Sequence, residues 1–215
     1  MRRRTPIVKG KRPYDTSRRQ DQARQRRERI VDAAERRFLR DGYVATTIAA
    51  VAGDAEVSAD TIYKSFGGKP GLVRAIRERA LEGDGAVPAE QRSDAVQMQA
   101  ADGRMIIEAW GVLTAEVAPK VAPILLLVRT AASTDADSQA LLDELDADRL
   151  RRMTDNARRL RDAGYLRTGV TLAQAADVLW TYSAPELYEL LVVRRGWKPA
   201  KYGRFVAAAM IDALL

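Results

Sequence analysis

Apolar residues recur at intervals of three and four positions along almost all of this 215-residue chain. The spacing is clear at Ile30, Ala34 and Phe38, and again near the end of the chain at Tyr202 and Phe205. Such spacing places apolar side chains on one face of an α-helix, whereas a half-buried β-strand would alternate apolar and polar residues. No alternating run of any length occurs. The sequence therefore predicts an all-α protein.

Glycine, proline and hydroxyl residues divide this pattern into helices. A first helix is expected from about residue 21 until Gly42, and a second begins at Thr46-Thr47. Ser58 is the expected N-cap of a third helix that ends at Gly67-Gly68, and Pro70 opens a fourth. We therefore predict a first helical domain over residues 21–82. A linker over 83–101 and a helical body over 102–215 are expected to follow it.

The charge is unevenly distributed. The net charge is +7, but residues 1–40 hold 15 Lys and Arg against 5 Asp and Glu, so the remainder is mildly acidic. Residues 1–20 also contain Pro6, Gly10 and Pro13 and lack apolar periodicity. They are predicted to form a disordered basic arm. A basic front end on an acidic body indicates a polyanionic partner for the front end, the alternative being a solubilising tail.

The composition excludes several classes of function. The chain contains no His and no Cys, which removes histidine acid–base chemistry, thiolate nucleophiles and the usual zinc sites. With no glycine-rich phosphate loop either, we expect no enzyme, no catalytic residue, no metal site and no cofactor. The longest apolar run, residues 121–128, is broken by Pro123 and too short to span a bilayer. We expect a soluble, cytoplasmic protein without a membrane partner.

Two short predicted helices joined by "GDAEV" (residues 53–57) form a helix-turn-helix pattern. In that motif the second helix lies in the major groove of DNA. Ile62 and Phe66 would face inward, while Tyr63 and Lys64 would face outward toward phosphates and base edges. Two core helices with solvated polar faces would produce the same pattern, so the spacing alone leaves both readings open.

The stretch "RRERIVDAAERRFLRDGYVATTIAAVAGDAEVSADTIYKSFGGKPGLVRAI" resembles the N-terminal domain of the TetR family of bacterial transcriptional regulators. The resemblance covers about 50 residues and rests on Gly42-Tyr43, Thr46-Thr47, Val57-Ser58, Thr61-Ile62-Tyr63 and Lys69, among others. It implies an N-terminal three-helix helix-turn-helix DNA-binding domain and a C-terminal helical domain for ligand binding and dimerisation. One residue departs from the family pattern, because Glu56 stands where the family usually has glycine. If that turn position needs a positive φ, glutamate is strained there.

Candidate DNA-binding residues follow from the motif, the helix ends and the basic arm. They are Thr47, Ser58, Ala59, Asp60, Thr61, Tyr63, Lys64, Lys69, Arg18, Arg19, Arg26 and Arg27. Candidate ligand-binding residues follow from the family resemblance and from large apolar residues in the body, for which core packing is the alternative. They are Ile106, Trp110, Leu113, Leu126, Leu179, Trp180 and Tyr182.

These features predict a sequence-specific, DNA-binding transcriptional regulator. We expect a homodimer, formed through the helices at about 171–193 and 199–214, that binds a near-palindromic operator in double-stranded DNA. A small apolar effector of unknown identity would release this repressor. The alternative is a DNA-binding architectural or interaction protein whose body only dimerises. Pro185, inside an apparently continuing helical pattern, predicts a kink or break that either forms a pocket wall or is a packing accident.

Overall fold

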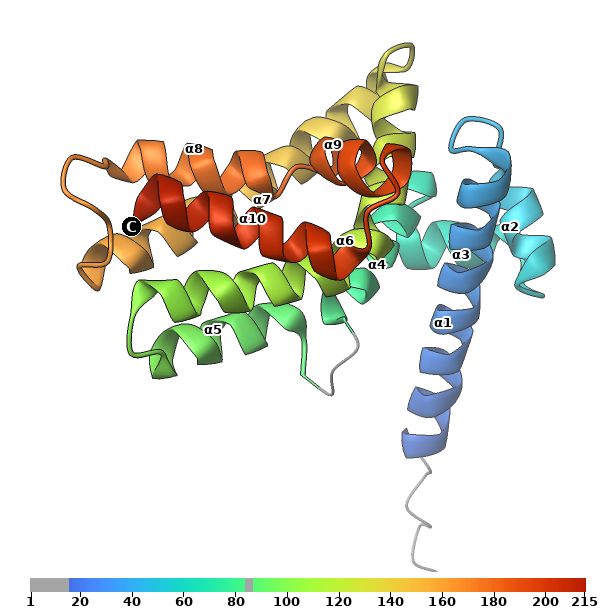
Figure 1. Ribbon diagram of the computed structural model, residues 1–215. Helices are drawn as coiled ribbons and strands as arrows, with labels where there is room; N and C mark the ends of the chain where they lie inside the picture. Colours follow the sequence, from blue (N-terminus) through green and yellow to red (C-terminus); the bar gives the residue numbers. More distant parts are fainter. Residues whose placement is uncertain (1–15, 84–86) are drawn as a thin grey trace, which may run out of the picture.

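The computed structural model describes residues 16–83 and 87–215, which form helices and contain no strand. The elements are α1 (Thr16–Asp41), α2 (Ile48–Asp54), α3 (Ala59–Phe66), α4 (Lys69–Glu82), α5 (Ala89–Gln99), α6 (Gly103–Ala132), α7 (Ala136–Asp162), α8 (Leu172–Tyr182), α9 (Pro185–Tyr188), the π-helix η1 (Glu189–Arg194) and α10 (Pro199–Leu214). Figure 1 shows two groups of helices, with α4 between them, and α1 of the first group also contacts α6 of the second. The prediction of an all-α protein is confirmed.

Helices α1 to α4 form the N-terminal unit, and their ends follow the capping signals of the sequence. The Thr47 hydroxyl accepts a hydrogen bond from the Ala50 amide, and the Ser58 hydroxyl accepts one from the Thr61 amide. Gly67 ends α3 in the left-handed conformation, with a φ of 74°, which glycine adopts without steric cost. The core between these helices is fully buried and consists of Ile30, Phe38, Val51, Ile62, Leu72 and their neighbours.

Two expectations for the connecting segments need correction. Residues 16–20, predicted to be part of a disordered arm over 1–20, are the first turns of α1; residues 1–15 lie outside the described part of the chain. Residues 83–101, predicted to be a linker, include the helix α5. Its amphipathic pattern is weak, so tertiary contacts must stabilise it. One of these is the hydrogen bond of 2.9 Å from the Trp110 indole to the Ser93 hydroxyl.

Helix α6 is the centre of the body and contacts α1, α4, α5, α7, α9 and α10. It runs without interruption for 30 residues through Pro119 and Pro123. By length and composition alone, α6 could cross a membrane. The shorter apolar run at 121–128, considered by itself, predicts no membrane span. Such apolar helices are also found at the centre of soluble domains, and here α6 is in contact with six other helices.

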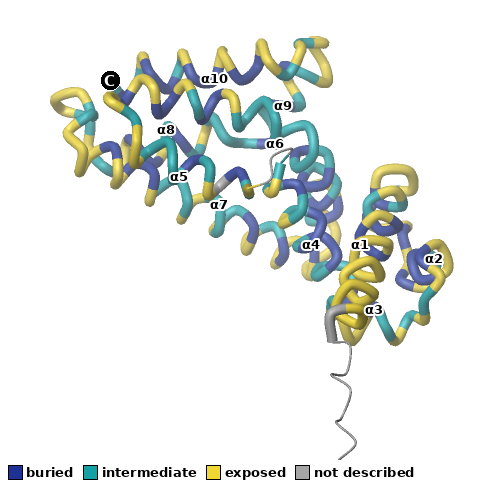
Figure 2. The backbone as a smooth tube through the Cα atoms, turned by 90° about the horizontal axis from the view of Figure 1, so that it is seen from below, coloured by how far each residue is buried: buried dark blue, intermediate teal, exposed yellow. Residues whose placement is uncertain are grey.

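Helix α4 joins the two groups of helices, as the ribbon and the burial view both show (Figures 1 and 2). Toward the N-terminal unit, Arg79 forms ion pairs with Asp32 and Glu35 of α1. Toward the body, the Arg74 Nε donates to Glu144 Oε1 of α7 at 2.7 Å. Helix α4 therefore connects the two parts of the molecule. It does so through charged contacts on both sides and through the buried Val73 and its neighbours.

The helix that the sequence pattern extends from 171 to 193 is broken at Pro185, as predicted. Helix α8 ends at Tyr182, and Pro185 is the first residue of α9. The Thr181 carbonyl, whose normal i+4 donor would be the proline nitrogen, instead accepts from the Ala184 amide at 3.1 Å. A π-helix then continues the chain. The Thr181 carbonyl therefore keeps a hydrogen-bond donor in spite of the helix break.

Candidate DNA interface and ligand cavity

The outward face of α3 is the candidate reading surface for DNA. Tyr63 is 57% exposed, whereas Ile62 beside it is fully buried in the core between α1, α2 and α4. Ile62 therefore points inward and Tyr63 points outward, as predicted. The predicted inward residue Phe66 is only partly buried, with the Arg27 guanidinium 4.8 Å from its ring centroid.

Lys64 and Asp60 form an ion pair on this face. The Lys64 Nζ lies 2.7 Å from Asp60 Oδ2, one helical turn away, and both side chains are about three-quarters exposed. A phosphate or a guanine edge would compete with Asp60 for the ammonium group, because exposed ion pairs contribute little to stability. Lys64 can therefore bind DNA, and only the weak ion pair with Asp60 is lost.

The hydroxyl groups at the helix starts are engaged in capping. Thr47 and Ser58 use their side-chain oxygens as acceptors for α2 and α3, and Ser58 and Thr61 share a hydrogen bond of 2.9 Å. Ala59 is half-buried at the first turn of α3. Helix starts attract anions through their free amide groups, so this arrangement suits a phosphate at the start of α3 although the hydroxyls already have partners.

Lys69 has a structural contact that the sequence did not predict. Its Nζ donates to the Tyr43 and Val44 carbonyls at 3.0 and 3.3 Å and lies 4.7 Å from the Tyr43 ring centroid. The contact ties the start of α4 to the loop between α1 and α2. An ammonium group has three donors, so one remains for a phosphate.

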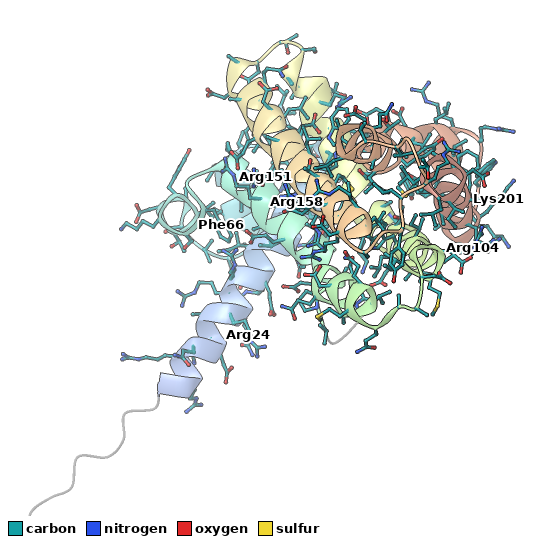
Figure 3. All side chains as sticks on the ribbon, turned by 90° about the vertical axis from the view of Figure 1, so that its left-hand side faces the viewer. Arg24, Phe66, Arg104, Arg151, Arg158 and Lys201 are labelled. Carbon is teal, nitrogen blue, oxygen red and sulfur yellow. The ribbon has the colours of Figure 1, made fainter. Side chains whose placement is uncertain are left out.

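The candidate arginines of the N-terminal region lie on α1, not on a flexible arm. Arg18, Arg19 and Arg26 are exposed, and Arg27 is in an ion pair with Glu78 of α4 at 3.4 Å. The first half of α1 projects away from the other helices, with Arg24 pointing into solvent (Figure 3). It presents positive charge on a helix that extends outward from the unit containing α3, an arrangement suited to a DNA backbone.

A cavity of about 210 Å³ lies inside the body. Helix α6 forms an apolar wall with residues such as Leu113, Val117 and Val121, and α7 forms the opposite wall. The cavity also reaches the joining helix α4 at Arg77 and Leu81. It therefore touches both the body and the element that leads to the DNA-binding unit.

The structure places three of the seven candidate ligand-binding residues on this cavity: Trp110, Leu113 and Leu179. Ile106, Leu126, Trp180 and Tyr182 are not among its lining residues. Ile106 packs in the core of the body, and Trp180 is covered by the Arg149 guanidinium at 4.5 Å from its ring centroid. Pro185, predicted as a possible pocket wall, does line the cavity.

Sequence reasoning missed the polar side of the cavity. Arg149, Arg152, Met153 and Asn156 of α7 all line it, because spacings of three, four and seven share one helical face. A signal was present: the polar residues Arg149, Arg152 and Asn156 flank the apolar stripe of α7 that includes Met153. Ser93 was missed for another reason, since it lies on α5, a helix that the sequence did not predict.

Arg149 occupies the gap left by the helix break. Its Nη1 donates to the Trp180 carbonyl at 2.5 Å and to the Ser183 hydroxyl at 3.1 Å, and its Nη2 donates to Asp146 at 3.2 Å. In an unbroken helix the Trp180 carbonyl would have accepted from the Ala184 amide, which turns to Thr181 instead. Burial lowers the pKa of Arg149, yet a guanidinium stays charged in proteins.

No site for a metal is apparent among residues 16–83 and 87–215, since no three Asp, Glu, His or Cys side chains gather there in a suitable arrangement. Tyr188 and Tyr202, both on the cavity, pack edge to face with ring centroids 5.6 Å apart. Burial raises the pKa of Tyr202 to about 12. Both phenols are therefore neutral at physiological pH and act as walls and hydrogen-bonding groups.

Comparison with known proteins agrees with this architecture. Residues 30–76 match the family model "Bacterial regulatory proteins, tetR family". No curated protein sequence matches the chain significantly.

Among solved structures, FadR from Bacillus subtilis in complex with stearoyl-CoA is similar with a TM-score of 0.68 and 15% identity, over 87% of this chain and 99% of FadR. The TetR-family regulator PfmR from Thermus thermophilus has a TM-score of 0.56 and 19% identity, over 88% and 97% of the two chains. A protein from Saccharomonospora viridis in complex with choline has a TM-score of 0.61 and 19% identity, over 88% and 97%. FadR and PfmR are described as transcriptional regulators.

Proposed function

We propose, from the premise that this chain is a DNA-binding transcriptional regulator of the TetR family, that it is a dimeric repressor whose operator affinity falls when a small molecule fills the body cavity. The DNA partner would be a near-palindromic double-stranded operator read by α3 of each subunit. As a DNA-bound regulator it would work in the bacterial cytoplasm.

The observation that carries the proposal is that α4 is part of the cavity wall. Arg77 and Leu81 line the cavity near the end of α4, and Lys69, at its other end, is bonded to the loop before α2. Arg77 also contacts Asp148 of α7 at 3.4 Å. A ligand that displaces the end of α4 would therefore move a helix whose start holds the DNA-reading unit.

A ligand can release DNA only if it binds more tightly to a conformation in which the two α3 helices no longer match the half-site spacing. Small shifts of packed helices are sufficient for such a change. A coupling of about 1–3 kcal/mol, or roughly 5- to 150-fold in operator affinity, is typical of such systems. The cavity counts against the alternative of an architectural protein, whose body would need no cavity.

The comparisons do not name the effector. Proteins of this fold were solved with ligands as different as stearoyl-CoA and choline, and the cavity of about 210 Å³ is below the range of roughly 300–1,000 Å³ common for drug-sized ligands. We therefore expect a small effector, or a larger one that enters by opening the body.

The test begins with selection of the operator from random DNA, followed by anisotropy measurements with a compound library. A true effector weakens operator binding at least fivefold and raises the melting temperature of the free protein. Ala118→Phe fills the cavity from α6 and should abolish the response while operator affinity stays normal. Val112→Phe, on an exposed part of α6, is the matched control and should respond as the wild type does. If no compound changes operator affinity, the ligand-released repressor is wrong and the architectural alternative is favoured.

A further inference from the structure

The two long walls of the cavity differ in chemical character. Wall residues from α6 are mostly apolar, among them Trp110, Leu113 and Leu125. Wall residues from α7 include the cation Arg149 and the amide Asn156. A ligand that satisfied both walls would need an apolar body and a polar head directed toward α7, since buried polar groups require hydrogen-bond partners.

Two polar atoms on the α7 wall are buried without a hydrogen-bond partner among the described residues: Arg149 Nε and Asn156 Oδ1. The Arg149 side chain is 12% exposed, and Asn156 is 5% exposed. Leaving such buried groups without a hydrogen-bond partner is unfavourable. Because both residues line the cavity, a bound oxygen acceptor is positioned to accept a hydrogen bond from Arg149 Nε. Asn156 Oδ1 is itself an acceptor, so the Asn156 amide pairs with the same ligand atom only when it is turned over to present its Nδ2 donor.

The charges around the cavity favour an anion. Arg77, Arg149 and Arg152 line it, and no Asp or Glu occurs among its described lining residues. The carboxylates that pair with these arginines, Asp148, Asp146 and Asp94, lie outside the lining. The described lining therefore contains three cationic side chains and no anionic one, a composition that suits a carboxylate, which arginine binds by charge-assisted hydrogen bonds.

We infer that the cavity binds an amphipathic carboxylate, with its head at Arg149 and its aliphatic chain against α6. The inference rests on the proposed ligand-responsive function and narrows it to a ligand class. An apolar cavity of 150 Å³ admits benzene, so the volume of about 210 Å³ suits a molecule of on the order of ten non-hydrogen atoms. A medium-chain aliphatic carboxylate has this size, and its chain would lie along Val117 and Leu113.

Titration calorimetry with octanoate, 1-octanol and octylammonium tests the head group at constant chain length. We expect octanoate to bind the wild-type protein at least about tenfold more tightly than the other two, because hydrogen bonds to charged groups contribute about 1.5–3 kcal/mol. Equal or tighter binding of octanol or octylammonium would overturn the carboxylate assignment. Absence of binding by all three would overturn it as well.

Arg149→Met should lower octanoate affinity about tenfold or more and leave octanol affinity nearly unchanged. Arg151→Met is the matched control: Arg151 is on the same helix, its side chain is 72% exposed, it does not line the cavity, and its loss should change neither affinity. Figure 3 shows Arg151 on α7. If Arg149→Met does not fold, Arg149→Lys keeps the charge without Nε and should bind octanoate at an intermediate affinity. Unchanged discrimination between octanoate and octanol in either folded variant would contradict the role of Arg149.

The same ligands are then added to the operator complex. Calorimetric binding of octanoate without operator release would leave the binding inference standing and contradict the proposed repressor mechanism. Operator release by octanol with no preference for octanoate would support the repressor mechanism and contradict the carboxylate assignment. The two measurements therefore separate failure of the ligand class from failure of the proposed function.

Discussion

Glu56 stands in the turn between α2 and α3 with a φ of 54°, the one positive φ at a non-glycine residue in the described part of the chain. Its amide donates to the Gly53 carbonyl at 3.2 Å, and the next amide, of Val57, donates to the Ala52 carbonyl at 3.0 Å. The turn is therefore formed as a glycine turn would be, with a Cβ in a region that L-residues avoid. The position therefore has the positive φ under which glutamate is expected from the sequence to be strained.

Replacing Glu56 with glycine should stabilise the protein. The left-handed conformation costs an L-residue about 1–2 kcal/mol, and glycine loses about 0.5–1 kcal/mol through its greater freedom in the unfolded state. A net gain of roughly 0.5–1 kcal/mol corresponds to a rise of about 1–4 °C in melting temperature for a chain of this size. Glu56→Ala keeps the Cβ and should show no such rise. Equal melting temperatures for the glycine and alanine variants would refute the strain argument.

Tyr63 and Lys64 should matter for DNA binding and not for folding, since both side chains are largely exposed. Tyr63→Phe removes one potential phosphate hydrogen bond and should weaken binding to all sequences alike. Lys64→Ala should reduce the slope of log affinity against log salt by about 1. Wild-type affinity and salt slope in both variants, measured by anisotropy on the selected operator, would disprove the assignment of α3 as the reading helix.

At the scale of helices, the body depends on the crossing of α6 and α10, where two glycines meet. A Cβ on Gly203 would lie 2.2 Å from the Gly111 carbonyl oxygen, and one on Gly111 would lie 2.6 Å from the Gly203 carbonyl oxygen. The absence of side chains lets the two backbones approach, which brings Tyr202 and Met210 of α10 to the cavity. The sequence pattern identifies both helices but not this contact.

Gly203→Ala should destabilise the protein by about 1–3 kcal/mol, the usual range for overpacking, since the obstacle is backbone. Gly53→Ala is the matched control in another helix, where an added Cβ meets nothing within 4 Å. That change should be neutral or stabilising by up to roughly 1 kcal/mol. Thermal denaturation followed by circular dichroism measures both. If the Gly203→Ala protein were as stable as the wild type, α6 and α10 could move apart without loss of stability, and the close contact at Gly203 would not be needed.

At the scale of the whole molecule, the dimer prediction needs a different basis from the one that the sequence offered. The apolar face of α10 was expected to be uncovered within the chain, but Val206, Met210 and Leu214 are buried in the core of its own body. What stays exposed nearby is a smaller set of large apolar residues, Leu190, Val193 and Phe205. Exposed large apolar residues on η1 and α10 are compatible with an interaction surface there, so a homodimer remains our prediction.

Phe205→Glu should convert the dimer to a folded monomer, because Phe205 is 41% exposed and the new charge would be buried in the interface. Sedimentation velocity at micromolar concentration measures the mass, and circular dichroism checks the helix content. Val44→Glu, at an exposed apolar residue of the DNA-binding unit, should leave the mass unchanged. A wild-type chain that sediments as a monomer would rule out the dimer altogether.

The sequence alone determined the elements that depend on local chemistry. Helix spacing, the caps at Thr47 and Ser58, the stop at Gly67 and the break before Pro185 are all found where the sequence predicts them. Each is a property of a few neighbouring residues and of the backbone hydrogen bonds that they can make. The family motif over the N-terminal unit is equally local, which is why the DNA-reading residues could be proposed from it.

Only the tertiary structure decided which residues surround the cavity. Helix α5 has too weak a pattern to be predicted, and its Ser93 reaches the cavity through packing on α6. Trp180 was expected in the pocket but is covered by Arg149, which the chain brings from 31 residues away to the carbonyl freed by the helix break. Contacts between distant segments depend on how helices cross, and the crossing depends on pairs such as Gly111 and Gly203 that no local pattern reveals.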